Sequence, residues 1–468
     1  MQSSFHLLHL GLSDADVHRL LAGQLVIHCP DMLLVPGSHT AIKSPMEGPG
    51  TIRLSHSEGI TYTLYPNGGL CQRDLMAVLA MEAGKLIGAD EMHQLIAVDT
   101  CQRAWLAEGL LPDFEHGPGG AVVQGKIAEL ELRAETTAEQ HDTLEMILPG
   151  RIRFSPNTSR KETVEIAGEH RGYRLSLDMA QTEVCGLKLE FSHQDQVTRV
   201  WGSAPRGGIR AETIDAILES LAIITASEVH WFLLDHISDG ARRIRVRMPR
   251  SRVDASRVGP PVEIRTPSPA SWDLFRKCVA YYSQRPSPQM PTIGQIFGMI
   301  VDAGRGSIEV ESIVLGTAVE MLLLHHVVPA SPSASPPDFT PDANRVRQFV
   351  ESQQDLAQRF RDRLKGFLDG IGSPRAKDSL EWLRERGLID KKQIKAFGKL
   401  RNPAAHGAVP SADGLQEHLD LCAEVLVLAY HVLFALVGYQ GDYVDYTKRN
   451  FPTARYEGSL TSNPKPGG

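Results

Sequence analysis

Residues 395–407 of the chain read KAFGKLRNPAAHG and join two segments with helical periodicity. Asn402 is a residue type that caps helices, and Pro403 suits a first helical turn because it lacks an N–H that the turn leaves unused. On an unbroken helix, Arg401 and His406 would lie about 140° apart around the axis. The sequence therefore predicts a helix break at this point, which lets the two side chains converge.

The two side chains favour one kind of chemistry. Arginine is always charged, and its planar fork of donors fits a phosphate. Histidine takes up or gives a proton near neutral pH. Together they suit metal-free cleavage of a phosphodiester, in which a ribose hydroxyl attacks its own phosphate. Spacing alone is not specific, and the alternative interpretation is a capped helix break with a surface arginine.

The context of this segment resembles a known family. KAFGKLRNPAAHG is followed by a long apolar helix and then by LVGYQGDYVDY, at residues 436–446. Together they resemble the HEPN superfamily, and within it the ApeA-like branch of prokaryotic antiviral proteins. The resemblance covers residues 300–450. The family's Arg-x4–6-His motif falls on Arg401 and His406, and its polar residue falls on Asn402.

The resemblance implies a function and a role for each motif residue. It implies an endoribonuclease of antiviral defence by abortive infection, active as a homodimer, which leaves 2′,3′-cyclic phosphate and 5′-hydroxyl ends. His406 would move protons between the 2′-hydroxyl and the leaving 5′-oxygen. Arg401 would neutralise charge that builds up on the phosphate, and Asn402 would orient one of these groups. A phage-derived trigger is the expected partner besides RNA.

The helices before the motif are basic although the chain is not. The whole chain has a net charge of −7, but residues 359–401 contain thirteen basic and six acidic residues. Such a local excess of positive charge suits a polyanion. Lys395 and Lys399, just before the motif, are the predicted contacts to the RNA backbone.

Composition limits the remaining possibilities. A length of 468 residues allows two or three domains. The six cysteines form no CxxC pair, which indicates reduced thiols and a cytoplasmic protein. No cofactor or metal is expected, since no histidine–carboxylate–cysteine cluster has ligand spacing. The N-terminus lacks the basic and apolar regions of a signal peptide.

The sequence predicts an α+β fold in three parts. Residues 1–297 form a β-rich sensing or regulatory region with a long helix near 211–236, residues 298–450 an all-α HEPN-like bundle, and residues 451–468 a flexible tail. Short β-rich runs such as GQLVIHCP (23–30) and GTIRLSHS (50–57) alternate with glycine and proline, and Ser57-Glu58-Gly59 predicts a hairpin turn. Residues 74–98 have helical spacing.

An arginine-rich stretch follows the predicted long helix. Residues 241–257 hold seven arginines and one acid, and RIRVRM alternates as a strand with one basic face would. Arg245 and Arg247 on this strand are predicted to contact RNA. The alternative is a charged edge strand that resists aggregation.

The helix after the motif is predicted to be a core or dimer-interface helix. Its apolar end, Val425–Val437, is too short to span a bilayer and is interrupted by His431, so no membrane association is expected. Before the motif, Pro329–Asp342 contains five prolines and predicts a flexible connection.

Two other functions remain open. One is a HEPN-like module that has lost catalysis and binds nucleic acid or protein. The other is a ligand sensor in which the β-rich region does the main work and the bundle only dimerises. Because an unrestrained ribonuclease would poison its host, we also expect residues 1–297 to restrain the site, and residues 298–468 alone to be more toxic than the full chain.

Overall fold

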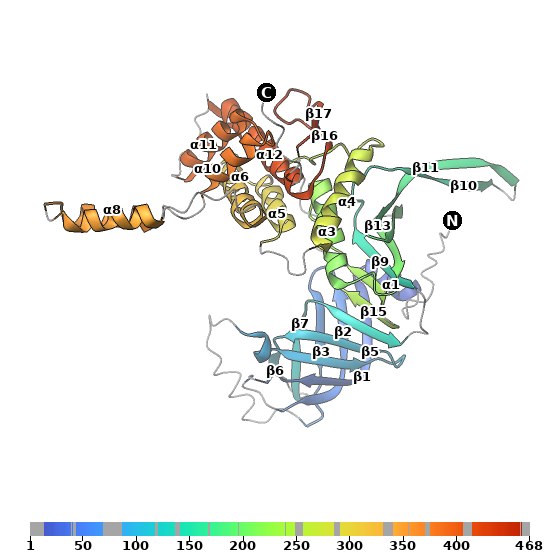
Figure 1. Ribbon diagram of the computed structural model, residues 1–468. Coiled ribbons are helices and arrows are strands. Elements are labelled where there is room, and N and C mark those ends of the chain that lie inside the picture. Colours follow the sequence, from blue (N-terminus) through green and yellow to red (C-terminus); the bar gives the residue numbers. More distant parts are fainter. Residues whose placement is uncertain are drawn as a thin grey trace. The chain divides into compact units, whose positions relative to one another are not determined.

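Figure 1 shows the computed structural model of the chain. It describes residues 14–38, 40, 44–68, 87–117, 120–135, 141–166, 169–194, 196–238, 240–248, 256–284, 291–330, 340–353, 355–369, 375–405, 414–458 and 460. The chain divides into two compact units. The first comprises Met1–Ile152, Gln181–Arg210 and His230–Arg252, and the second comprises Arg153–Ala180, Ala211–Val229 and Val253–Gly468. The β-rich N-terminal region and the helices that follow it confirm the predicted α+β class.

The first unit is built on an antiparallel sheet, preceded by the helix α1 (Asp14–Leu21). Its strands are β1 (Gln24–Val35), β2 (Met46–Ser55), β3 (Gly59–Leu64), β4 (His93–Val98), β5 (Ala104–Leu110), β6 (Asp113–Gly117), β7 (Gly120–Ile127), β8 (Leu130–Glu135), β9 (His141–Pro149), β12 (Leu187–Gln194), β13 (Val197–Pro205), β14 (Leu233–Ser238) and β15 (Ala241–Val246), with the short 3-10 helix η1 (Ala89–Glu91) before β4. In the part of the chain that is described, the order is β12-β13-β9-β14-β15-β8-β5-β4-β1-β2-β3-β7-β6. Beyond β12 the order continues through β11 (Glu169–Val184) to β10 (Thr158–Ile166).

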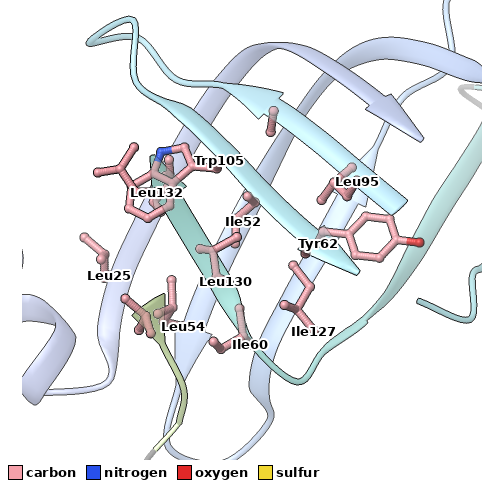
Figure 2. Close-up of a cluster of buried hydrophobic side chains, with 14 of the residues drawn as sticks. Leu25, Ile52, Leu54, Ile60, Tyr62, Leu95, Trp105, Ile127, Leu130 and Leu132 are labelled. Carbon is pink, nitrogen blue, oxygen red and sulfur yellow. The ribbon is translucent and has the colours of Figure 1, made fainter. Parts of the chain in front are cut away.

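The core of the first unit follows from alternation along the strands. In β2, Ile52 and Leu54 are buried, whereas Arg53 between them is exposed. Side chains in a strand point alternately to opposite faces, so one apolar face is created from every second residue. Figure 2 shows such side chains, among them Trp105 and Tyr62, converging from several strands on one apolar interior.

Most of the predicted strands are confirmed. GQLVIHCP and GTIRLSHS lie in β1 and β2, and the hairpin turn is confirmed because β2 ends at Ser55 and β3 begins at Gly59. Gly59 has φ +85°, a conformation that glycine adopts without strain. The helical prediction for residues 74–98 is wrong at its end, where 93–98 form β4. Residues 69–86 lie outside the described part.

The prediction of a long helix at 211–236 is wrong for residues 226–236. α3 spans Ala211–Thr225 and ends at Ala226, which has φ +45°. The apolar run that follows enters β14, which pairs with β9 and β15. A short apolar run is ambiguous between a buried helix and a buried strand, and here pairing within the sheet decides it.

The arginine-rich strand has a different environment from the one predicted. Residues 243–246 of RIRVRM lie in β15, but β15 lies between β14 and β8 and is not an edge. The interpretation of a charged edge strand is therefore wrong. Ile244 and Val246 of β15 are buried in the core and Arg242 lies on their face, whereas Arg243 and Arg245 alternate to the other face.

The second unit is mainly helical. Its described helices are α3, α4 (Pro269–Ser283), α5 (Ile293–Ala303), α6 (Ile308–Leu322), the π-helical turn η2 (Leu323–Val327), α7 (Val328–Ala330), α8 (Thr340–Ser352), α9 (Gln358–Asp369), α10 (Ala376–Glu385), α11 (Lys391–Ala405) and α12 (Leu415–Val437). Gly387 and Gly438 follow α10 and α12 with φ +70° and +69°, as helix ends often require. Most of the predicted connection Pro329–Asp342 lies outside the described residues.

The helices before residue 298 pack with those after it. Thr292 caps α5 and donates from Oγ1 to Glu219 of α3 at 2.9 Å. Phe297 of α5 stacks on Tyr430 of α12, with ring centroids 5.8 Å apart, and the Tyr430 hydroxyl donates to the carbonyl oxygen of Gly259. The helical unit therefore includes α3, α4 and all of α5, which is more than the segment 298–450 expected from the sequence.

The C-terminal segment is ordered further than predicted. β16 (Gly441–Val444) pairs with β17 (Thr453–Tyr456), and Tyr456 is 5% exposed. The prediction of a flexible tail from residue 451 is thus wrong for this strand. Two described helical stretches of 23 residues, Ile308–Ala330 and Leu415–Val437, are long and apolar enough to cross a membrane. In the second, 78% of the apolar window is buried inside the structure, as in the core helix of a bundle.

Candidate functional site

Arg401 lies on α11 and faces α6. Its Nε lies 2.8 Å from Oε1 of Glu320 in an ion pair, with the arginine side chain 45% exposed and the glutamate 28% exposed. Gly316, one turn earlier on α6, faces Arg401, and a Cβ on it would be in ordinary van der Waals contact with Cβ and Cγ of Arg401, at 3.4 Å. The contact between α6 and α11 therefore fixes the orientation of the Arg401 side chain and leaves its guanidinium group partly accessible.

The predicted helix break at Asn402-Pro403 is wrong. α11 continues through both residues to Ala405. Proline removes one backbone hydrogen bond and strains the turn before it. Because Pro403 lies in the last turn of α11, only a few helical hydrogen bonds are affected. Upstream, Phe397 and Leu400 are buried and hold the helix in the bundle. His406 lies outside the described residues, so its distance from Arg401 stays a prediction.

The two predicted lysines are on the exposed side of α11. Lys395 is exposed, and Lys399 lies 3.4 Å from Glu417 of α12, with both side chains more than 60% exposed. Lys392, on the same helix, pairs with Glu424. An exposed ion pair such as Lys399–Glu417 contributes about 0–1 kcal/mol, so a phosphate can replace the carboxylate there.

Arg245 and Arg247 belong to the first unit, whereas Arg401 belongs to the second. Both contact Glu129, at 3.4 Å from Arg245 and 2.6 Å from Arg247. Both guanidinium groups also lie over the ring of Trp231, at 5.3 Å and 4.1 Å from its centroid. These contacts order the two arginines without ligand. Their role in binding RNA stays a prediction.

A polar cavity at the other end of α11 has no counterpart in the sequence predictions. Its volume is about 690 Å³, and its lining includes Arg386, Gln393, His431, Arg455 and Tyr456. Two signals in the sequence point to it: an Asp-x-x-Gln capping box at 390–393, and a histidine inside an otherwise apolar helix. Neither signal by itself predicts that the capping box and the histidine lie side by side.

His431 is the histidine that lines this cavity, and its pKa is strongly shifted. Burial lowers its pKa to about 4, although Asp390 and Asp445 act in the opposite direction. Its ring packs between those of Tyr443 and Tyr456, each with its centroid 4.9 Å away. At neutral pH the imidazole is therefore uncharged, and it acts as a hydrogen-bonding group.

This pKa predicts how stability depends on pH. The unfolded chain takes up a proton on His431 near pH 6.5, whereas the folded chain does so only near pH 4. The contribution of His431 to stability is thus complete above pH 6.5 and falls by about 3 kcal/mol as the pH drops toward 4. We expect the loss of stability between pH 7 and 4.5, measured by urea unfolding, to be smaller by about 2–3 kcal/mol in His431→Phe than in the wild-type chain. Equal losses in both chains would contradict a neutral, buried His431.

Comparison with known proteins adds no further constraint on the site. No family model matches the chain, and neither a curated protein nor a solved structure matches it. Among the described residues, no three histidine, cysteine, aspartate or glutamate side chains are grouped as metal ligands.

Proposed function

We propose that the chain is a metal-independent endoribonuclease of the HEPN type that acts in antiviral defence by abortive infection. The observation that supports this proposal most is the exposure of Arg401 and its ion pair with Glu320. Its guanidinium is half-exposed on a helical bundle, and an ion pair through Nε fixes its position. Arginine has five N–H donors, so this pairing leaves donors for a phosphate. The arginine also occupies the first position of the motif that carries the family resemblance.

In the proposed reaction, His406 accepts the proton of the ribose 2′-hydroxyl as the 2′-oxygen attacks the adjacent phosphorus. The bond from phosphorus to the 5′-oxygen breaks, and a histidine returns a proton to that oxygen. Arg401 stabilises the charge that develops on the phosphate. Asn402 orients one of these groups. The products are a 2′,3′-cyclic phosphate and a 5′-hydroxyl, and no water or metal enters the step.

Other parts of the chain have supporting roles in this proposal. Lys395 and Lys399 contact the RNA backbone on one side of Arg401. A homodimer brings two histidines to one phosphate, which explains how one residue type serves as both base and acid. The first unit recognises a phage-derived trigger or restrains the site, with Arg245 and Arg247 as RNA contacts. The protein acts in the cytoplasm.

The proposal is tested by incubating the purified full chain with total RNA in EDTA and sequencing the new ends. We expect cleavage in chelator at an unchanged rate. Loss of cleavage in EDTA that one divalent ion restores would contradict the proposal.

Glu320 offers a separate test, since it positions Arg401. Glu320→Ala removes the acceptor that holds Nε, so we expect the rate of cleavage at saturating RNA to fall by about tenfold, or ~1.4 kcal/mol in the barrier. Glu320→Gln keeps an oxygen at the same place and is expected to retain most of the rate. Faster cleavage by Glu320→Ala would instead show that the carboxylate competes with the phosphate.

A further inference from the structure

The cavity at the start of α11 contains a hydrogen-bonding arrangement that fixes the state of His431. Asp390 and Gln393 form a capping box: the Gln393 backbone N–H donates to Oδ1 of Asp390 at 2.8 Å, and the Asp390 N–H donates to Oε1 of Gln393 at 3.0 Å. The amide oxygen of Gln393 is thereby identified, because a backbone N–H needs an acceptor. The amide nitrogen must then face Nδ1 of His431, 3.0 Å away.

An amide nitrogen can only donate, so Nδ1 accepts and the neutral ring carries its proton on Nε2. That Nε2–H is buried and has no hydrogen-bond partner among the described residues. The hydroxyl of Tyr456, whose ring lies beside the imidazole, is likewise buried and without a partner there. Two neutral donors in the wall of one cavity thus lack acceptors. Buried donors normally have a hydrogen-bond acceptor, so two donors without one indicate a ligand that supplies acceptors.

Charged groups accompany these donors around the cavity. Arg386 is held with its guanidinium carbon 3.8 Å from the ring centroid of Trp382. Arg455 is 67% exposed and lies 3.6 Å from Asp442 and 3.7 Å from Glu457, distances that indicate weak surface pairs. An anionic group can exchange for these carboxylates.

The acids that line the cavity limit the choice of ligand. Glu385, Asp390 and Glu457 contribute three carboxylates against the two arginines. A purely anionic ligand would be repelled by them, whereas hydroxyl or amino groups would find acceptors. The ligand therefore needs one anionic group, several donors and a neutral part with acceptors. A volume of about 690 Å³ is in the range of small-molecule sites.

We propose that this cavity binds a nucleoside monophosphate. The base places its acceptors against His431 Nε2–H and the Tyr456 hydroxyl, and the ribose hydroxyls donate to carboxylates of the rim. The phosphate interacts with Arg386 and Arg455. The site is separate from the proposed cleavage site, since it adjoins the first residue of α11 while Arg401 lies ten residues further along, about 15 Å away on a straight helix.

Calorimetric titration of the full chain tests the proposal, with AMP, GMP, CMP and UMP as probes and with the matching nucleosides and inorganic phosphate for comparison. We expect at least one monophosphate to bind with one site per chain. Its nucleoside and inorganic phosphate should bind at least about tenfold more weakly, since each lacks part of the contacts. If inorganic phosphate binds as tightly as the nucleotide, the site recognises only an anion, and the proposal is overturned.

Matched variants locate the binding. Tyr456→Phe keeps the ring and removes one donor, and His431→Phe replaces the imidazole by an apolar aromatic ring without the Nε2–H donor, so each is expected to weaken binding by about fivefold to tenfold. Arg386→Ala should weaken it as well, whereas Arg384→Ala, on α10 and paired with Glu381 at 2.6 Å, should leave it unchanged. Circular dichroism verifies the fold of each variant.

Two results would contradict the proposal. One is the absence of binding by all four nucleotides at millimolar concentration. The other is binding that neither His431→Phe nor Tyr456→Phe changes while both are folded. A His406→Ala chain should bind the nucleotide as the wild type does, which separates this test from that of the proposed cleavage.

Discussion

Arg401→Ala is expected to lower the rate of RNA cleavage by about 10²–10³-fold, the usual cost of removing a group that stabilises a transition-state anion. Arg401→Lys should recover little, because a single ammonium group cannot replace a planar fork of donors. His406→Ala should lower the rate by about 10²–10⁴-fold through loss of proton transfer. Single-turnover rates on a defined RNA in EDTA measure these changes.

The control for these variants is Lys391→Ala at the start of the same helix, where the side chain is exposed. It should cleave within about twofold of the wild type, since a surface lysine far from the phosphate contributes only to long-range attraction. The ion pair of Arg401 is half-exposed, so Arg401→Ala should also change the melting temperature little. Cleavage at the wild-type rate by folded Arg401→Ala or His406→Ala would remove the basis of the proposed function.

A fragment of residues 298–468 is expected not to fold. The cut at residue 298 divides α5 and removes α3, α4 and the Thr292 cap. It also removes Phe297, which is 4% exposed and stacks on Tyr430. Loss of a single buried aromatic side chain costs about 3–5 kcal/mol, and the whole stability of a domain is only about 5–15 kcal/mol. The fragment should therefore be insoluble or show no cooperative thermal transition by circular dichroism.

The full chain is the reference for this comparison, and Phe297→Ala in the full chain should lose part of the same stability. A soluble fragment that melts cooperatively at the temperature of the full chain would show that α3–α5 are dispensable for the bundle. This architecture also changes how restraint by the N-terminal region has to be tested. Toxicity of an unfolded fragment says nothing about restraint, so substitutions in the full chain are required.

Sequence patterns predicted the helices and strands whose structure is determined by their own residues. Short β-rich runs bounded by glycine and proline placed β1 and β2, and the long apolar run placed α12. These patterns failed where pairing with strands distant in the sequence determines the structure. The run after Ala226 fits a helix or a strand equally well, and only β9 and β15 on either side make it β14. The same applies to β15, whose basic face resembled an edge strand.

The candidate site was predictable only in part. The motif marked Arg401, but its partner Glu320 lies 81 positions earlier on another helix, and no periodicity connects them. Asn402 and Pro403 carry signals for a helix start, yet packing of Phe397 and Leu400 upstream lets α11 run on to Ala405. The cavity at His431 required a strand from residues 453–456, in a segment whose composition indicated a flexible tail.

The proposed reaction requires the ribose 2′-hydroxyl as the nucleophile. It is tested most directly with a defined RNA in which a single 2′-deoxynucleotide replaces the residue on the 5′ side of the mapped cleavage site. We expect the wild-type chain, in EDTA, no longer to cut at that position and still to cut unmodified sites to 2′,3′-cyclic phosphate ends. Undiminished cleavage at the deoxy position, with 3′-hydroxyl or 3′-phosphate ends, would show that water attacks the phosphate and that the 2′-hydroxyl is not the nucleophile.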